Sequence, residues 1–288
     1  MSIAATPEPT TFGRGPWIWA TLADLGGLAI LAASALASPF RPRLDAPRLP
    51  RSVIHHAGWM LGMGLPLVGL VHVSFGSFLA MQAYFGATFT EATGIVVGLG
   101  LIRNVAPLLS GFVLAGLIAA TVCGDLRGGA RPGLDDPASL PDRDVARGDR
   151  PDPRPTPGRG RIALARVLGA SLAGPVLALW GVFVGSLMGL LVARSMLGQS
   201  PAIFLGKVAE MLQPMDVIGL LVKGAAFPAS AALIATFEGL RPDREGGPSA
   251  YRAVLRSVVA VLILNFTWFN LVYLAADPFG PDVVASAG

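Results

Sequence analysis

Charged residues are scarce in this chain of 288 residues: 14% are Asp, Glu, Lys or Arg, against about 25% in a typical soluble domain. Four long stretches contain none at all, namely residues 57–90, 104–124, 167–193 and 257–276. An apolar run of about 20 residues can cross a hydrocarbon core roughly 30 Å thick. The scarcity of charge therefore excludes an ordinary soluble domain and predicts an all-α polytopic membrane protein.

Cysteine and histidine are almost absent as well. Cys123 is the single cysteine, which excludes an intramolecular disulfide and any multi-cysteine metal site. His55 and His56 are adjacent, and consecutive helical residues point about 100° apart, so they do not converge on one ion. His72 stands alone between apolar residues and is expected in the core. We expect no metal site and no cofactor.

The motifs of several enzyme classes are missing too. The stretch "FLGKVAE" lacks the first glycine and the Ser or Thr of a nucleotide-binding G-x-x-x-x-G-K-[ST] loop. No G-x-S-x-G or H-E-x-x-H motif occurs. We therefore expect no catalytic residue, and a membrane enzyme acting on lipids is the weakest alternative because no nucleophile or metal constellation supports it.

Arginine is the abundant charge, and its positions predict the topology. A basic balance (net charge +4) would suggest nucleic acid in a soluble protein, but loop arginines orient membrane proteins, so we expect no nucleic-acid partner. The arginines gather at 41–51, 127–161 and 241–256, and these segments alternate with nearly neutral ones at 82–93 and 194–215. Five spans place every arginine-rich segment on one face, which the positive-inside rule makes cytoplasmic. The N-terminus is then inside and the C-terminus outside.

The expected organisation has three parts. Residues 1–52 hold an N-terminal tail and the apolar stretch 16–37, which Asp24 interrupts, so this stretch is either a short span or a helix lying in the interface. Residues 53–276 form a five-span domain, and residues 277–288 form an external tail. The spans are expected at about 53–80, 94–123, 163–192, 216–238 and 254–275.

Two segments between the spans have a character of their own. Residues 128–160 hold seven prolines, six arginines, six aspartates, six glycines and no aromatic residue. Such a composition cannot bury enough apolar surface to offset the entropy of ordering it, which predicts a disordered cytoplasmic loop. Further on, Ser200 and Pro201 form a good N-cap and first-turn pair for a short helix, which Pro214 can end.

Two cations fall inside expected spans. An ionisable group in hydrocarbon costs at least about 2.5–3.5 kcal/mol, so Arg103 and Lys223 each need a cavity, a partner or a place near the headgroups. Both lie about two turns or more into their spans, at a similar depth from the outer side. A path for anionic headgroups and snorkelling to the interface both remain open.

Small residues recur at four-residue spacing: Gly94 and Gly98 in the second span, and Gly181, Gly185 and Gly189 in the third. This spacing lets helix backbones approach closely. We expect it to serve packing within the chain, with a dimer interface as the alternative.

Residues 99–126, "LGLIRNVAPLLSGFVLAGLIAATVCGDL", resemble the signature of the MlaE/YrbE permeases, the membrane subunits of MCE-type lipid ABC transporters. The segments "ASPFRPR", "GLLVKGAAFPASAALIATFEGLR" and "REGGPSAYRAVLRSVV" also look like this family, and the resemblance covers about residues 35–276 with five spans in register. The signature residues that match at the right spacing are Arg103, Pro107, Ala115, Gly116, Asp125 and Leu126.

The resemblance implies an MlaE-like permease fold, in which residues 16–37 are an N-terminal interfacial helix before five transmembrane helices. It also implies a bacterial cytoplasmic (inner) membrane location, a cytoplasmic ABC ATPase subunit and an MCE-domain lipid-binding protein outside. The implied cargo is lipid, whether phospholipid, sterol or fatty acid. The implied assembly is a homodimer, and a heterodimer with a related permease stays open.

The resemblance also carries candidate sites. The lipid-pathway candidates are Arg103, Asn104, Lys223 and Asn265, where both asparagines replace acidic residues of family members. After Leu126 the family continues into a short amphipathic helix expected to dock on the ATPase, and the proline-rich loop stands in its place. Contacts with the ATPase are then expected from its flanks, at Asp125, Leu126, Arg127, Arg161 and Arg166.

These features predict a permease subunit of an MCE/Mla-type ABC transporter that moves lipids across or out of the membrane, driven by a separate ATPase. The alternative is a non-transporting membrane scaffold or partner subunit that anchors an MCE-type assembly. The missing docking helix favours the scaffold, whereas the retained spans and Arg103 favour the transporter.

Overall fold

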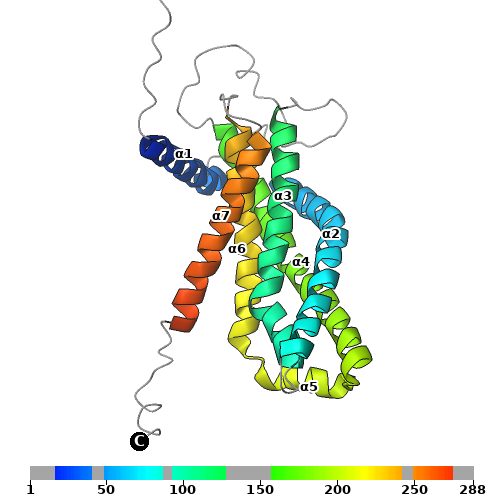
Figure 1. Ribbon diagram of the computed structural model, residues 1–288. Coiled ribbons are helices and arrows are strands. Elements are labelled where there is room, and N and C mark those ends of the chain that lie inside the picture. Colours follow the sequence, from blue (N-terminus) through cyan, green and yellow to red (C-terminus); the bar gives the residue numbers. More distant parts are fainter. Residues whose placement is uncertain (1–16, 41–48, 87–92, 128–156, 242–248, 275–288) are drawn as a thin grey trace, which may run out of the picture.

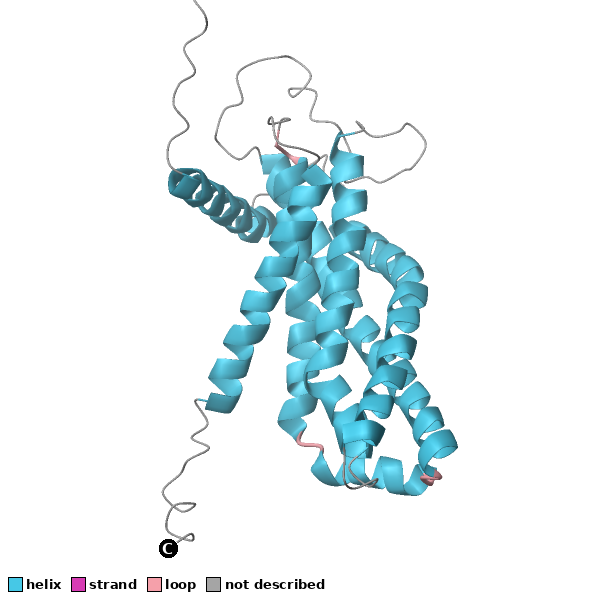
Figure 2. Cartoon of the chain, viewed as in Figure 1, coloured by secondary structure: helices cyan, strands magenta, loops and turns pink. Residues whose placement is uncertain are grey.

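The computed structural model describes residues 17–40, 49–86, 93–127, 157–241 and 249–274. These residues form helices joined by short connections, with no strand among them (Figure 1 and Figure 2). The all-α prediction is therefore confirmed. The elements are α1 (Trp17–Ala37), η1 (Ser38–Phe40), α2 (Leu49–Gly86), η3 (Ile95–Leu99), η4 (Leu101–Val105), α3 (Ala106–Arg127), α4 (Pro157–Leu197), α5 (Pro201–Met211), α6 (Pro214–Gly239), α7 (Ser249–Phe269) and η6 (Asn270–Leu274).

Six described helical segments are long and apolar enough to cross a membrane. The last five correspond to the five predicted spans, so the polytopic prediction is confirmed. The structure extends most of these spans beyond the charge-free runs, because a helix can end in the polar interface. The segments are Thr21–Phe40, Leu49–Phe85, Ile95–Leu126, Arg159–Met196, Pro214–Gly239 and Ser249–Val272.

The first of these segments differs from the rest in its direction. Figure 1 shows α1 lying across one end of the bundle, whereas the other long helices run along it. It packs against α4 and α6, and a Cβ added at Gly27 would lie 2.8 Å from the Phe237 ring. This arrangement suits the expected interfacial helix, whose place in a membrane remains a prediction.

The short helix α5 joins α4 to α6 at the end of the bundle opposite α1 (Figure 1). The Ser200 hydroxyl accepts a hydrogen bond from the Ile203 backbone N–H at 3.3 Å, which confirms the predicted N-cap. The prediction for Pro214 is wrong, because α5 ends at Met211 and Pro214 begins α6. Proline suits that position, since the first helical residue needs no N–H partner.

The predicted disordered loop falls largely on residues 128–156, which lie outside the described residues, as do the tails 1–16 and 275–288. Helix α4 begins at Pro157, so the last four residues of the expected loop, 157–160, are helical. A proline is tolerated in the first turn of a helix for the reason given above.

Helices α2 and α4 make the most extensive helix pair. A Cβ added at Gly76 would lie 2.0 Å from the Gly185 carbonyl oxygen, and one at Gly181 would lie 2.6 Å from the His72 ring. A Cβ added at Gly189 would lie 2.4 Å from the Val97 side chain of η3. The predicted use of these small residues in packing within the chain is confirmed.

The second pair of small residues has a similar role at the entry to α3. A Cβ at Gly94 would lie 2.6 Å from the Phe204 carbonyl oxygen, and one at Gly98 would lie 2.4 Å from the Val208 side chain. Both neighbours belong to α5, so this pair seats α5 against the π-helical turns that precede α3.

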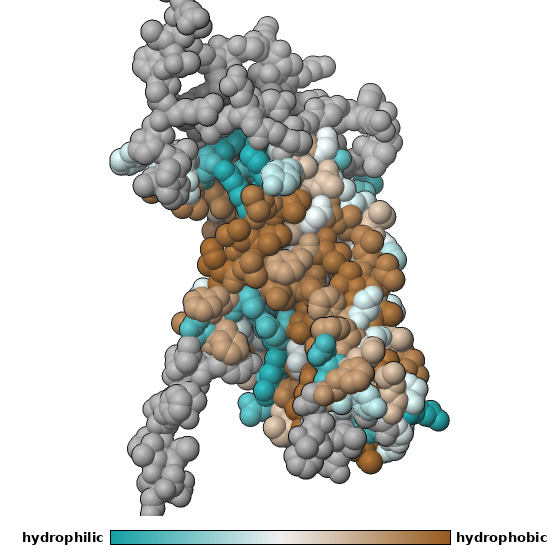
Figure 3. Space-filling view, viewed as in Figure 1, coloured by the Kyte–Doolittle hydropathy of each residue, from teal (hydrophilic) through white to brown (hydrophobic). Residues whose placement is uncertain are grey.

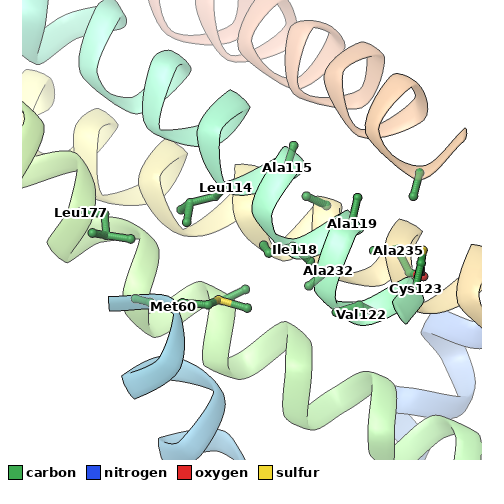
Figure 4. Close-up of a cluster of buried hydrophobic side chains, with 14 of the residues drawn as sticks. Met60, Leu114, Ala115, Ile118, Ala119, Val122, Cys123, Leu177, Ala232 and Ala235 are labelled. Atoms are coloured by element: carbon green, nitrogen blue, oxygen red, sulfur yellow. Dashed lines mark hydrogen bonds between the residues drawn. The ribbon is translucent and has the colours of Figure 1, made fainter. Parts of the chain in front are cut away.

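The largest core cluster lies where α3 meets α2, α4, α6 and α7 (Figure 4). Leu114 and Ile118 of α3 are fully buried there, beside Met60, Leu177 and Ala232 of the neighbouring helices. In a bilayer, helices associate chiefly through close van der Waals packing, and small residues allow it. The core fixes α3 and α6 side by side, which positions the polar residues of both.

Candidate functional site

Polar residues gather in two places on the face seen in Figure 3. One lies at the end of the bundle near α1, the other forms a strip over the far half of α6, and a hydrophobic band separates them. Each place holds a set of linked charges. We name them the Arg103 cluster (Arg103, Asp216 and Lys223) and the Glu238 cluster (Asp24, Glu238, Arg241, Arg252 and Arg256).

The Arg103 cluster is built on a two-point ion pair. Arg103 of η4 donates from Nε to Asp216 Oδ1 at 2.8 Å and from Nη2 to Asp216 Oδ2 at 3.2 Å. The Asp216 side chain is 1% exposed and that of Arg103 is 35% exposed. Asp216 also accepts from the Gln213 backbone N–H at 3.0 Å as part of a capping box. The start of α6 therefore fixes the carboxylate, and the carboxylate fixes the guanidinium.

Lys223 joins this pair from two turns further along α6. It lies seven positions after Asp216, so both side chains lie on one face of the helix, about 10 Å apart along its axis. Lys223 is buried, and its Nζ donates a hydrogen bond to the Arg103 carbonyl oxygen. Arg103 lies in a π-helical turn, a feature that is frequent at functional sites.

The structure thus brings two of the four predicted lipid-pathway residues together. Asn104 is exposed, while Asn265 of α7 is partly buried and its Oδ1 has no hydrogen-bond partner among the described residues. Asp216 was not among the predicted site residues, because in the sequence it stands only at the boundary of a span. Its spacing of seven residues from Lys223 was the signal that could have found it.

A cleft of about 200 Å³ lies between α6 and α7 beside this cluster. Lys223 is the one charged residue in its lining, and the other lining residues are mostly apolar. The cleft therefore combines a cationic wall with a hydrocarbon-like interior. The lining residues are Val222, Lys223, Ala226, Phe227, Leu264, Thr267, Trp268 and Leu271.

The Glu238 cluster ties three helices together near the other end of the bundle. The Glu238 side chain of α6 is fully buried and accepts hydrogen bonds from Arg252, at 3.2 Å, and from Arg256 of α7. Asp24 of α1 accepts from Arg241 and Arg256. A buried carboxylate needs such partners, because an uncompensated charge in the interior is costly. The cluster therefore holds α1 against α6 and α7.

The predicted ATPase-contact residues differ in how far they are accessible. Asp125 is 61% exposed and lies 3.9 Å from a nitrogen of Arg166, whose side chain is 1% exposed. Leu126 packs against the largest core cluster, and its side chain would lie 2.7 Å from a Cβ added at Gly239. Arg161 is half-buried. The Arg127 backbone is helical, and its side chain lies outside the described residues.

The cysteine and the core histidine have packing roles. Cys123 is buried, with its thiol 3.6 Å from the Ala235 carbonyl oxygen. His72 is fully buried and its Nδ1 lies 2.7 Å from the Val68 carbonyl oxygen, which confirms the predicted core histidine. Within the described ranges, no three His, Cys, Asp or Glu side chains are grouped so that they could hold a metal ion.

Comparison with known proteins identifies the family. Residues 159–270 match the family described as Permease MlaE. A probable ABC transporter permease protein of Synechocystis sp. is 30% identical over 210 residues, which is 72% of this chain and 74% of that protein. The chain belongs to the MlaE permease family. Probable ABC transporter permease proteins of Rickettsia conorii and Rickettsia felis are each 26% identical to this MlaE permease over 250 residues, covering 84% of this chain and 90% of theirs.

Membership in the MlaE permease family confirms the resemblance seen in the sequence. The match to the family spans α4 to α7 and includes Asp216 and Lys223, whereas Arg103 precedes it. An MlaE permease with several apolar helices is a multi-pass membrane protein of the ABC transporter class, which implies a partner that hydrolyses ATP.

Proposed function

We propose that this MlaE permease is the lipid-moving subunit of an MCE/Mla-type transporter in the bacterial inner membrane, driven by a separate ATPase. The Arg103 cluster is the observation that carries the proposal. Two cations and a buried carboxylate lie inside a spanning bundle, beside an apolar cleft. Ionisable groups are expensive at that depth and commonly mark substrate paths.

In this proposal Arg103 and Lys223 bind the polar part of the lipid, and Asn104 and Asn265 line the same path. Asn104 is accessible, and the buried Asn265 Oδ1 is an acceptor available to a headgroup hydroxyl or ammonium. Asp216 has a positioning role, because its two hydrogen bonds fix the plane of the Arg103 guanidinium.

The arrangement of partners follows the topology predicted from the arginines. The α1 end of the bundle faces the cytoplasm and the ATPase, and the α5 end faces outward to an MCE-domain protein. Asp125 and Arg161 are the accessible candidates for the ATPase contact. Two such permeases form the transporter, either as a homodimer or with a related chain. Their exposed apolar side chains, such as Phe266 at 70% exposure, face lipid or the second permease.

The test is reconstitution of the full chain with the ATPase that co-purifies from its native membrane, in vesicles that contain a fluorescent phospholipid. We expect ATP-dependent lipid movement, and we expect Lys223→Gln to slow it about tenfold or more, as for a lost charged contact of roughly 1.4 kcal/mol. Lys207→Gln is the matched control, because Lys207 is half-exposed and pairs with Glu210 on α5. Wild-type rates for Lys223→Gln would overturn the assigned path.

The scaffold is the second candidate, and the sequence of residues 128–156 favours it, because no amphipathic docking helix is encoded there. ATP hydrolysis by the co-purified ATPase distinguishes the two functions. A transporter subunit should change the hydrolysis rate when lipid is added, since chemistry and transport are coupled. A rate that is indifferent to both the permease and lipid would favour the scaffold.

A further inference from the structure

We infer that the Glu238 cluster holds the headgroup of one anionic phospholipid of the surrounding bilayer, and that an acyl chain of this lipid lies along the adjoining face of α7. The lipid is a fixed part of the protein that braces α1 against the bundle, and it is not the cargo that the permease moves. The inference therefore goes beyond the proposed function and does not depend on it.

The first step is the way in which α1 and α7 meet. Helix α1 packs against α4 and α6, and among the described residues its contact with α7 is slight. Figure 1 shows α1 and α7 diverging from the same end of the bundle. The ion pair between Asp24 and Arg256 joins the two helices there. A molecule bound beside this ion pair would contact both of them.

Accessible positive charge is the second step. Three arginines and two carboxylates make up the Glu238 cluster, so their formal charges sum to one positive charge. The side chains of Glu238 and Asp24 are 0% and 13% exposed, whereas that of Arg256 is 39% exposed. The carboxylates are therefore the inner part of the cluster, and Arg256 is its accessible part.

Arg256 is also held in place before any ligand arrives. Its Nη1 donates to Glu238 and its Nη2 donates to Asp24, and these bonds use two of the five N–H donors of a guanidinium. Since the two carboxylates fix the side chain, little side-chain entropy is lost when a phosphate binds the remaining donors. Arginine suits this role because its planar group matches the geometry of phosphate oxygens.

The third step is an exposed apolar face that continues from Arg256 along α7. Val259, Ile263 and Phe266 follow Arg256 by three, seven and ten positions, so they lie on one side of the helix with it. All three side chains are exposed. Ten residues of helix rise about 15 Å, which is half of a hydrocarbon core roughly 30 Å thick. An acyl chain that starts at the level of Arg256 therefore crosses its own leaflet along this face.

The fourth step identifies the ligand as an anionic phospholipid. Figure 3 shows the polar side chains near α1 bordering the hydrophobic band directly, as the headgroup of a lipid borders its chains. A free phosphate would leave the apolar face of α7 uncovered. The ammonium of phosphatidylcholine would lie close to three guanidinium groups, whereas phosphatidylglycerol has no cation. A basic residue at the membrane surface favours an anionic lipid roughly fivefold.

The test compares variants of the full chain, purified in detergent and titrated with phosphatidylglycerol or with phosphatidylcholine that has the same chains. Native mass spectrometry records the bound lipid, and hydrogen exchange records the protection of α1. Val259→Glu places a carboxylate one turn from Arg256, which cancels the surplus charge and keeps every ion pair of the cluster. Arg256→Gln removes the accessible cation itself. Arg194→Gln, at an exposed position near the other end of the bundle, is the matched control.

We expect Val259→Glu and Arg256→Gln to bind phosphatidylglycerol roughly fivefold more weakly than wild type, and Arg194→Gln to bind it as wild type does. Phosphatidylcholine should bind equally to wild type and Val259→Glu. Phosphatidylglycerol should slow hydrogen exchange of α1 in wild type and leave it unchanged in Val259→Glu.

Three outcomes would overturn the inference. Equal affinity of wild type and Val259→Glu for phosphatidylglycerol would show that this site holds no anionic lipid, and an equal loss of phosphatidylcholine would show that charge plays no part. Displacement of the lipid by an equal concentration of inorganic phosphate or glycerophosphoglycerol would show that the site binds a free phosphate group. Exchange of α1 that ignores the lipid would refute the bracing role. None of these measurements involves ATP or lipid movement, so their failure leaves the proposed function standing.

Discussion

One of the two closest helix contacts among the described residues offers a sharp test of the packing. A Cβ added at Gly76 of α2 would lie 2.0 Å from the Gly185 carbonyl oxygen of α4, and 2.7 and 2.8 Å from the carbonyl carbon and Cα. All three neighbours are backbone atoms, so no side-chain rotation can relieve the overlap. Gly76→Ala must therefore push α2 and α4 apart until that carbon and oxygen reach an ordinary contact of at least 3.4 Å.

The cost follows from the loss of contacts along this helix pair. A gap of about 0.5–1 Å already forfeits a quarter to a half of the dispersion attraction between facing atoms, and overpacking typically costs about 1–3 kcal/mol. Alanine has a better helix propensity than glycine, which offsets up to about 1 kcal/mol of this cost. We expect a net loss of about 2 kcal/mol for Gly76→Ala, which corresponds to an apparent Tm lower by roughly 4–8 °C.

The matched control is Gly62→Ala on the same helix, because nothing lies within 4 Å of a Cβ added there. Its apparent Tm should stay constant or rise slightly, for the reason of helix propensity alone. Both variants are heated in detergent and assayed by size-exclusion chromatography at one heating rate, since irreversible unfolding depends on that rate. If Gly76→Ala and Gly62→Ala lose their folded peak at the same temperature, the close approach of α2 and α4 is not real.

Three further predictions concern the two ends of the bundle. Glu238→Gln should destabilise the protein by about 3 kcal/mol, because it removes the buried charge that compensates the partly buried Arg252 and Arg256. Glu210→Gln on the exposed pair of α5 should cost less than about 1 kcal/mol. Equal melting temperatures of the two variants would contradict this. Asp24→Asn should loosen α1, so hydrogen exchange should speed up in α1 and stay constant in the middle of α7; unchanged exchange in α1 would show that the helix is held without that ion pair. Single cysteines at Gly124 and Gly206, in a background without the native cysteine, should react with an impermeant thiol reagent from opposite sides, Gly124 from the cytoplasm; labelling of both from one side would refute the five-span topology.

Much of the architecture could be predicted from the sequence because hydropathy is a local property. Four of the five spans contain a long charge-free run, and the span at 216–238 is an apolar run interrupted by Lys223. Such runs are visible because a residue is placed in hydrocarbon largely by its own transfer free energy. The N-cap at Ser200 could be predicted for the same reason, because one side chain and the next backbone N–H groups decide it. The role of Pro214 was misjudged because a proline can end one helix or begin the next, and the sequence does not indicate which.

The site was only half predictable. Arg103 and Lys223 were found because a cation inside an apolar run is conspicuous, while Asp216 was missed because it lies at the edge of its run. An acidic residue at a span end is ordinary on its own, since it suits the first turn of a helix. Its role at the site becomes visible only when the structure shows that its partner is Arg103.

The sequence alone determined which segments are apolar, how many of them there are, and where the arginines between them gather. The tertiary structure decided which charges meet. Arg103 and Asp216 are 113 positions apart, and Asp24 and Arg256 are 232 apart. No local pattern encodes such a pairing, because it depends on how helices pack through their glycines and on which residue of each helix then faces its neighbour. When the helices are packed in a medium without water, each buried carboxylate must lie beside a cation, because an uncompensated charge there is too costly.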